Sequence, residues 1–202
     1  MRRLILVIVC CLWLVAIWSV EKDEKQQVPK CSFCREGKCK YHLAADRQLT
    51  PDEKKMMENA IHILLDRKRN VYEREEAAWL LGEKIAHRDC IEVLKRVAFD
   101  KKEDRGVRYW AATALSQIAD RQIIPLLIDL TLDDEVGGRA KEQLWKLTGL
   151  RFPPGIKEAE KEEKWEDWWA RIKYKYHKAW MDWWEKNKDT FVIDRTKALI
   201  EY

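Results

Sequence analysis

Residues 74–100, REEAAWLLGEKIAHRDCIEVLKRVAFD, and residues 108–133, RYWAATALSQIADRQIIPLLIDLTLD, decide the fold because they are two copies of one pattern. Ala78 aligns with Ala112 and Leu81 with Leu115 at the same offset. After a one-residue gap, the offset between the two copies is one position shorter. Each copy reads as two helices, an alanine-rich one followed by one rich in Leu, Ile and Val. One such pair cannot bury its apolar face alone, whereas stacked pairs share a core.

The repeat has flanking elements on both sides. A third, partial copy covers residues 136–147, and a helix is expected to precede the first copy. Thr50-Pro51-Asp52-Glu53 places Thr at the N-cap, Pro at the first helical position and Glu at the third, which is the capping-box pattern. The sequence therefore predicts an all-α solenoid over residues 50–150.

The repeated residues resemble a known family. AAWLLG at 77–82 and VRYWAATALSQIADRQIIPLL at 107–127 are similar to HEAT-like repeats, in the short form related to the phycobilin-lyase repeats. The resemblance covers about residues 72–148. It implies a short α-solenoid that serves as a protein-binding scaffold, and, as a weaker alternative, a lyase-like protein that handles bilins or other tetrapyrroles.

Residues 151–202 contain a tryptophan-rich segment. It holds two similar blocks, WEDWW at 165–169 and WMDWW at 180–184. At about 100° per residue the segment forms an amphipathic helix with an aromatic stripe. The expected stripe consists of Trp165, Trp168, Trp169, Ile172, Tyr176, Ala179, Trp180 and Trp183.

Packing of this stripe on the repeats is the favoured interpretation of the tryptophan helix. Leu147-Thr148-Gly149 followed by W-x-x-W-W resembles the tail of some bacterial HEAT-repeat proteins, in which such a helix packs back on the stack. An aromatic stripe could instead contact a partner helix, a membrane surface, or a stacked carbohydrate or base. Trp184 lies off the centre of the stripe, so it is expected to be exposed.

The N-terminus predicts membrane attachment. Residues 4–20, LILVIVCCLWLVAIWSV, carry no charge, and the length of this segment lies between that of a signal-peptide core and that of a spanning helix. We expect residues 1–20 to be an uncleaved single-pass anchor, with a cleaved signal peptide as the alternative. Arg2 and Arg3 favour an extracytoplasmic soluble part, although the Lys and Arg side chains between 22 and 40 favour the opposite orientation.

A cysteine cluster lies in the polar linker over residues 21–49. Residues 31–42 read CSFCREGKCKYH, and four ligand-capable side chains have spacings suited to tetrahedral zinc. These are Cys31, Cys34, Cys39 and His42. Disulfides that include Cys90, free thiols and thiol-redox chemistry remain open alternatives, because the choice depends on the compartment.

Other function classes lack support. The 39 Lys and Arg exceed the 35 Asp and Glu by only four charges, which does not favour a nucleic-acid partner. The chain contains no phosphate-binding glycine loop, nucleophile elbow, HExxH motif or EF-hand loop, and its four histidines are scattered. We therefore expect a protein that is not an enzyme.

The sequence thus predicts a membrane-anchored scaffold that binds another protein. The candidate contact residues are Trp79, Arg108, Trp110 and Trp184. Trp79 and Trp110 could equally belong to the core. A zinc-binding or thiol-redox protein centred on the cysteine cluster is the second hypothesis.

Overall fold

The computed structural model describes residues 45–159, 163–191 and 193, all of which belong to one compact unit, Lys40–Tyr202. Every regular element in these residues is helical, which confirms the all-α class for this part of the chain. The elements are α2 (Pro51–Leu65), α3 (Val71–Leu80), the π-helix η2 (Leu81–Ile85), the 3-10 turn η3 (Arg88–Cys90), α4 (Ile91–Phe99), α5 (Arg105–Ile118), α6 (Ile123–Leu130), α7 (Gly137–Thr148) and α8 (Trp165–Asn187).

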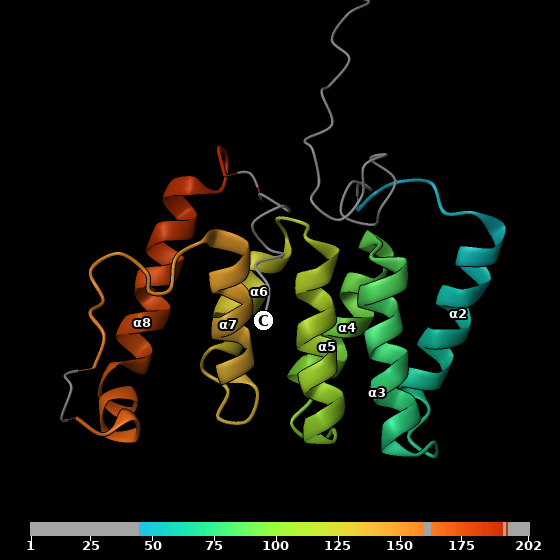
Figure 1. The fold of residues 1–202 in the computed structure, drawn as a ribbon, viewed down its shortest axis with the longest axis horizontal. Helices are drawn as coiled ribbons and strands as arrows, with labels where there is room; N and C mark the ends of the chain where they lie inside the picture. Colours follow the sequence, from blue (N-terminus) through green and yellow to red (C-terminus); the bar gives the residue numbers. More distant parts are fainter. Residues whose placement is uncertain (1–44, 160–162, 192, 194–202) are drawn as a thin grey trace, which may run out of the picture. The chain divides into compact units, whose positions relative to one another are not determined.

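The helices form two layers. Helices α3, α5 and α7 follow one another in the first layer, while α4 and α6 lie behind them, and α2 packs on α3 at the start of the row (Figure 1). Helix α8 packs on α6, so it extends the second layer after the loop that follows α7. The arrangement is that of a short helical solenoid. None of the helices in the described ranges combines the length and the apolar character that a membrane span requires.

Helix starts follow the local sequence. The Thr50 side chain accepts a hydrogen bond from the Glu53 N–H at 3.2 Å, and Glu53 Oε2 accepts one from the Thr50 N–H at 2.9 Å. This confirms the capping box. Asn70 and Asp104 cap α3 and α5 in the same manner, each with its side chain accepting from a backbone N–H of the first turn.

The one-residue gap between the two repeats corresponds to the π-helix. The Ala86 N–H donates to the Leu81 carbonyl at 2.9 Å, a bond between residues five apart that accommodates one additional residue in the turn. The equivalent helix α5 contains no such turn. Both helices then end on an alanine in the left-handed region, Ala86 at φ 46° and Ala119 at φ 53°. The two copies of the repeat are therefore aligned again at the end of this helix.

Small residues set the distance between α3 and α5. Ala77 and Ala78 of α3 are buried, and so are Ala111 and Ala112 of α5. In η2, which continues α3, Gly82 also lies close to α5, because an added Cβ there would lie 2.5 Å from the Ala114 Cα. The core on either side is filled by fully buried branched side chains, which include Leu81, Leu94, Leu115, Ile124 and Leu127.

Candidate functional site

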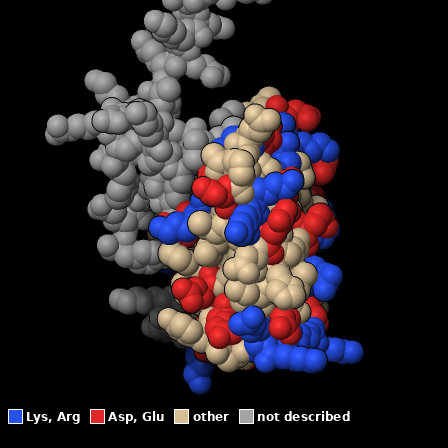
Figure 2. Space-filling model, turned by 90° about the vertical axis from the view of Figure 1, so that its right-hand side faces the viewer, with Lys and Arg blue, Asp and Glu red and all other residues tan. Residues whose placement is uncertain are grey.

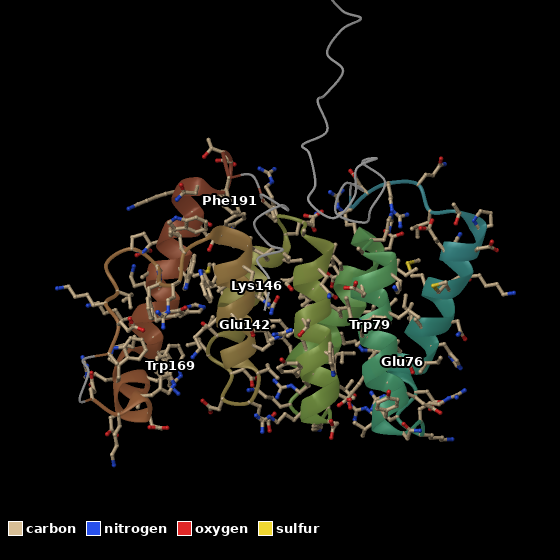
Figure 3. All side chains as sticks on the ribbon, in the orientation of Figure 1. Glu76, Trp79, Glu142, Lys146, Trp169 and Phe191 are labelled. Atoms are coloured by element: carbon tan, nitrogen blue, oxygen red, sulfur yellow. The ribbon has the colours of Figure 1, made fainter. Side chains whose placement is uncertain are left out.

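An open groove of about 340 Å³ runs along the contact between α3 and α5. Its lining consists of Tyr72, Glu75, Glu76, Trp79 and Trp110. Glu76 and Trp79 extend from the same side of α3 (Figure 3). The groove thus combines aromatic walls with two carboxylates, and it contains two of the four residues that the sequence predicts as partner contacts.

Helical spacing explains why these side chains meet. Relative to Tyr72, the positions of Glu75, Glu76 and Trp79 are i+3, i+4 and i+7, so all four share one face of α3. The small residues between the two helices bring α5 close enough for Trp110 to join them. Tyr109 holds Trp110 from the side, because the two rings meet edge to face with centroids 5.8 Å apart.

The groove is electrostatically negative at its carboxylates. Among the described residues, no cationic side chain forms an ion pair with Glu75 or Glu76. An added Cβ at Gly106 would lie 1.8 Å from Glu75 Oε1, so this carboxylate lies directly against the first turn of α5. That turn carries the partial positive charge of a helix N-terminus. Glu76 remains exposed to solvent.

The prediction for Arg108 is wrong, because its side chain is fully buried rather than presented to a partner. Arg108 Nε donates to the Ala98 carbonyl at 3.1 Å, and its two terminal nitrogens form ion pairs with Asp133 and Glu135. The residue joins three successive helical segments of the solenoid. A charged residue in the first turn of a helix suggests a surface position, and its burial here depends on distant acidic partners in the loop before α7.

The prediction for Trp184 is also wrong, since only 8% of this residue is exposed. The buried row of α8 follows every fourth residue, from Trp168 to Trp184. Residues four positions apart form a row that runs obliquely to the helix axis. A helix that packs along such a row buries a different set of residues from the straight stripe that the sequence predicts. Trp165, which the straight stripe includes, is 45% exposed for the same reason.

A second groove, of about 280 Å³, lies beside α7 and α8. Its lining includes Lys141, Trp145 and Trp165. Burial lowers the pKa of Lys141 to about 8, and the Lys141 Nζ lies 3.4 Å from the centroid of the Trp169 ring. The lysine is therefore already engaged by an aromatic face of the same chain, and this groove is the weaker candidate for a partner.

The predicted metal ligands, Cys31, Cys34, Cys39 and His42, lie outside the described residues. In the part of the chain that the structure describes, no group of three or more His, Cys, Asp or Glu could hold a metal ion. Cys90 carries a free, fully buried thiol, and burial raises its pKa to about 11. A disulfide that includes Cys90 is thus not formed in this structure.

The fold defines a class of protein, a short α-solenoid, and this one has an open groove between α3 and α5. Residues 58–145, from α2 to α7, match the family model of HEAT repeats. No curated protein and no solved structure matches the chain. The match confirms the resemblance to HEAT-like repeats, whereas the relation to phycobilin-lyase repeats and to bacterial tails stays a prediction. HEAT repeats are generally non-catalytic, and the comparisons identify no catalytic family.

Proposed function

We propose that this chain is a membrane-anchored, non-enzymatic HEAT-repeat scaffold that binds another protein through the groove between α3 and α5. One observation carries the proposal: Trp79 and Trp110, from successive repeats, line one open groove. Half-buried tryptophans in a pocket are the residue type on which binding energy concentrates in protein interfaces. That HEAT repeats commonly mediate protein interactions supports the same function.

The anchor and the compartment complete the proposal. Residues 4–20 would hold the chain in the membrane, and residues 45–193 would extend from it on the extracytoplasmic side. The mixed charges on the surface favour a protein partner over a nucleic acid. On the side that carries α2, Lys and Arg are interspersed with Asp and Glu and form no continuous basic surface (Figure 2).

Site-specific photo-crosslinking tests the proposal. A photoreactive benzoylphenylalanine replaces Tyr72, which is 74% exposed at the groove, in the full chain expressed in its native membrane. The matched control carries the same group in place of Tyr174, which is 70% exposed on α8 and lines neither groove. We expect a defined protein to crosslink from position 72 and not from position 174.

A substitution in the groove tests whether the crosslink depends on the groove. Trp79→Ala in the position-72 chain should reduce the crosslink about tenfold or more, as the loss of an interface tryptophan does. Thermal unfolding of the variant establishes that it remains folded. A crosslinked protein that persists at the same yield after Trp79→Ala, or that appears equally at position 174, would exclude the groove as the binding site.

The second candidate function is a zinc-binding or thiol-redox module at Cys31, Cys34, Cys39 and His42, and the spacing of these residues supports it. The metal content and free thiols of the full chain, purified with and without reductant, test this candidate. One equivalent of zinc that is lost in a Cys31→Ser/Cys34→Ser/Cys39→Ser variant would support it. The absence of metal, with two of the three cluster thiols unreactive until reductant is added, would mean that the cluster holds a disulfide instead.

A further inference from the structure

Within the described part of the chain, the carboxylates of the groove between α3 and α5 have no cationic partner. Glu142 provides the contrast, because in the other groove its carboxylate accepts a hydrogen bond from Arg139 at 2.6 Å and forms an ion pair with Lys146 at 3.0 Å. Glu75 and Glu76 have no such partner among the described residues. A ligand that supplies a positive charge would therefore complete the α3–α5 groove, whereas it would have to displace existing ion pairs in the other.

The aromatic walls of the groove favour the same chemistry. The negative face of a tryptophan ring attracts a cation within about 6 Å of its centroid. The Lys84 Nζ already approaches the Trp79 ring to 5.5 Å, at the outer end of that range. Trp110 carries no cation among the residues that the structure describes, since its one ring contact there is with Tyr109. Its exposed surface is thus open to a cation from outside.

We infer that the groove binds an arginine side chain from an extended segment of the partner protein. This inference rests on the proposed function, and it names the chemistry of the partner. A guanidinium can stack its flat face on an indole while its N–H groups donate to a carboxylate, which an ammonium group cannot do as well. The volume of about 340 Å³ is at the low end for ligand pockets, so it suits one or two side chains.

Peptides that differ in one side chain test whether binding to the groove requires a positive charge. Three fluorescein-labelled peptides of identical sequence carry arginine, lysine or citrulline at the centre, and fluorescence anisotropy measures their binding to the full chain in neutral detergent. Citrulline has the shape of arginine without its charge. We expect arginine to bind about tenfold more tightly than citrulline, with lysine between them. Equal affinities for arginine and citrulline would overturn the inference.

Charge-neutralising variants locate the binding site. Glu76→Gln keeps the shape of the side chain and should weaken arginine-peptide binding about threefold to fivefold, because an exposed pair contributes modestly. Glu75→Gln should act in the same direction. Glu58→Gln on α2 is the matched control, since Glu58 is exposed and lies outside the groove. Binding that is unchanged in the Glu75→Gln/Glu76→Gln double variant would place the peptide elsewhere.

The chain with the photoreactive group at position 72 distinguishes failure of this inference from failure of the proposed function. If position 72 captures a protein whose yield does not depend on Glu75 and Glu76, the scaffold function holds and the arginine inference fails. If position 72 captures no protein, the scaffold function itself fails. A crosslink to residues 22–40 of the same chain, which are rich in Lys and Arg, would overturn the inference in favour of an intramolecular occupant.

Discussion

Arg74 and Arg108 occupy equivalent positions in successive repeats. Arg74 Nε donates to the Leu64 carbonyl at 3.0 Å, and Arg108 Nε donates to the Ala98 carbonyl at 3.1 Å, so the two acceptors are separated by the same interval as the two arginines. Each guanidinium then pairs with a carboxylate in the following loop, Glu103 for Arg74 and Asp133 for Arg108. The repeated arginine therefore joins neighbouring pairs of helices.

Removal of Arg108 should destabilise the fold strongly. Arg108→Ala leaves the buried Asp133 carboxylate without its guanidinium, and breaking a buried pair on one side costs about 3–5 kcal/mol. Urea unfolding of the full chain in detergent measures the loss. Arg105→Ala, at an exposed position one turn earlier, should change stability by less than about 0.5 kcal/mol. Equal effects of the two variants would contradict the structural role of Arg108.

Acid should remove the contribution of Asp133. Burial acts to raise its pKa, but hydrogen bonds from Lys101, the Val136 backbone and Arg108 outweigh burial and hold the pKa at about 2. Because the folded pKa lies below the ordinary value of 3.8, the stabilisation is present above pH 4 and is lost as pH falls towards 2. The expected loss is about 1–2 kcal/mol.

The comparison with Asp133→Asn isolates this effect from the titration of other carboxylates. The difference in unfolding free energy between the parent chain and the variant should be constant from pH 7 to 5. It should then shrink between pH 4 and 2, because only the parent chain has this carboxylate to protonate. A difference that stays constant to pH 2 would show that Asp133 does not titrate on unfolding.

The sequence predicts the repeats well because their information is local and periodic. The one-residue change in the repeat offset marks the turn that becomes η2. The misplaced residues depend on longer-range geometry. The burial of Arg108 requires a carboxylate from the loop before α7, and the burial of Trp184 requires the angle at which α8 lies on α6. Neither relation appears in the spacing of one helix.

Two glycines should respond oppositely to the same substitution. Gly82→Ala forces a methyl group to within 2.5 Å of the Ala114 Cα, so it should destabilise by about 1–3 kcal/mol through overpacking. Gly138→Ala meets nothing within 4 Å and replaces a poor helix former near the start of α7, so it should stabilise by about 0.5–1 kcal/mol. Thermal unfolding compares the two; a loss of stability in Gly138→Ala would contradict the open surroundings.

Deletion of Lys84 should be tolerated. The residue is exposed in η2, and shortening this turn by one residue converts it to an ordinary α-helical turn while the helices on both sides keep their faces. We expect a change in stability of less than about 1 kcal/mol.

Deletion of Gln117 is the matched control, because it removes one residue from α5, which has no π-turn to absorb the loss. The deletion rotates Ile118 and the following chain by about 100° relative to the core, so it should unfold the repeat. Circular dichroism and thermal unfolding distinguish the two chains. If both deletions are tolerated equally, η2 is not the position of the additional residue.

Two effects of opposite sign act on the charged form of Lys141. Burial disfavours its charge and lowers its pKa to about 8, whereas the Trp169 ring 3.4 Å from Nζ attracts the ammonium. A lysine with a lowered folded pKa destabilises the fold below pH 8. This cost is relieved as pH rises from 8 to the ordinary value of 10.5, because the unfolded chain binds the proton over that window.

Lys141→Met, of similar length but without charge, decides between the two effects. If burial dominates, the variant is more stable than the parent chain at pH 7 by about 1–3 kcal/mol, and the advantage narrows between pH 8 and 10.5. We expect this result, because the shift of the pKa is downward. A variant that is less stable at pH 7 would mean that the indole binds the ammonium more strongly than burial disfavours it, and that Lys141 fastens α8 to α7.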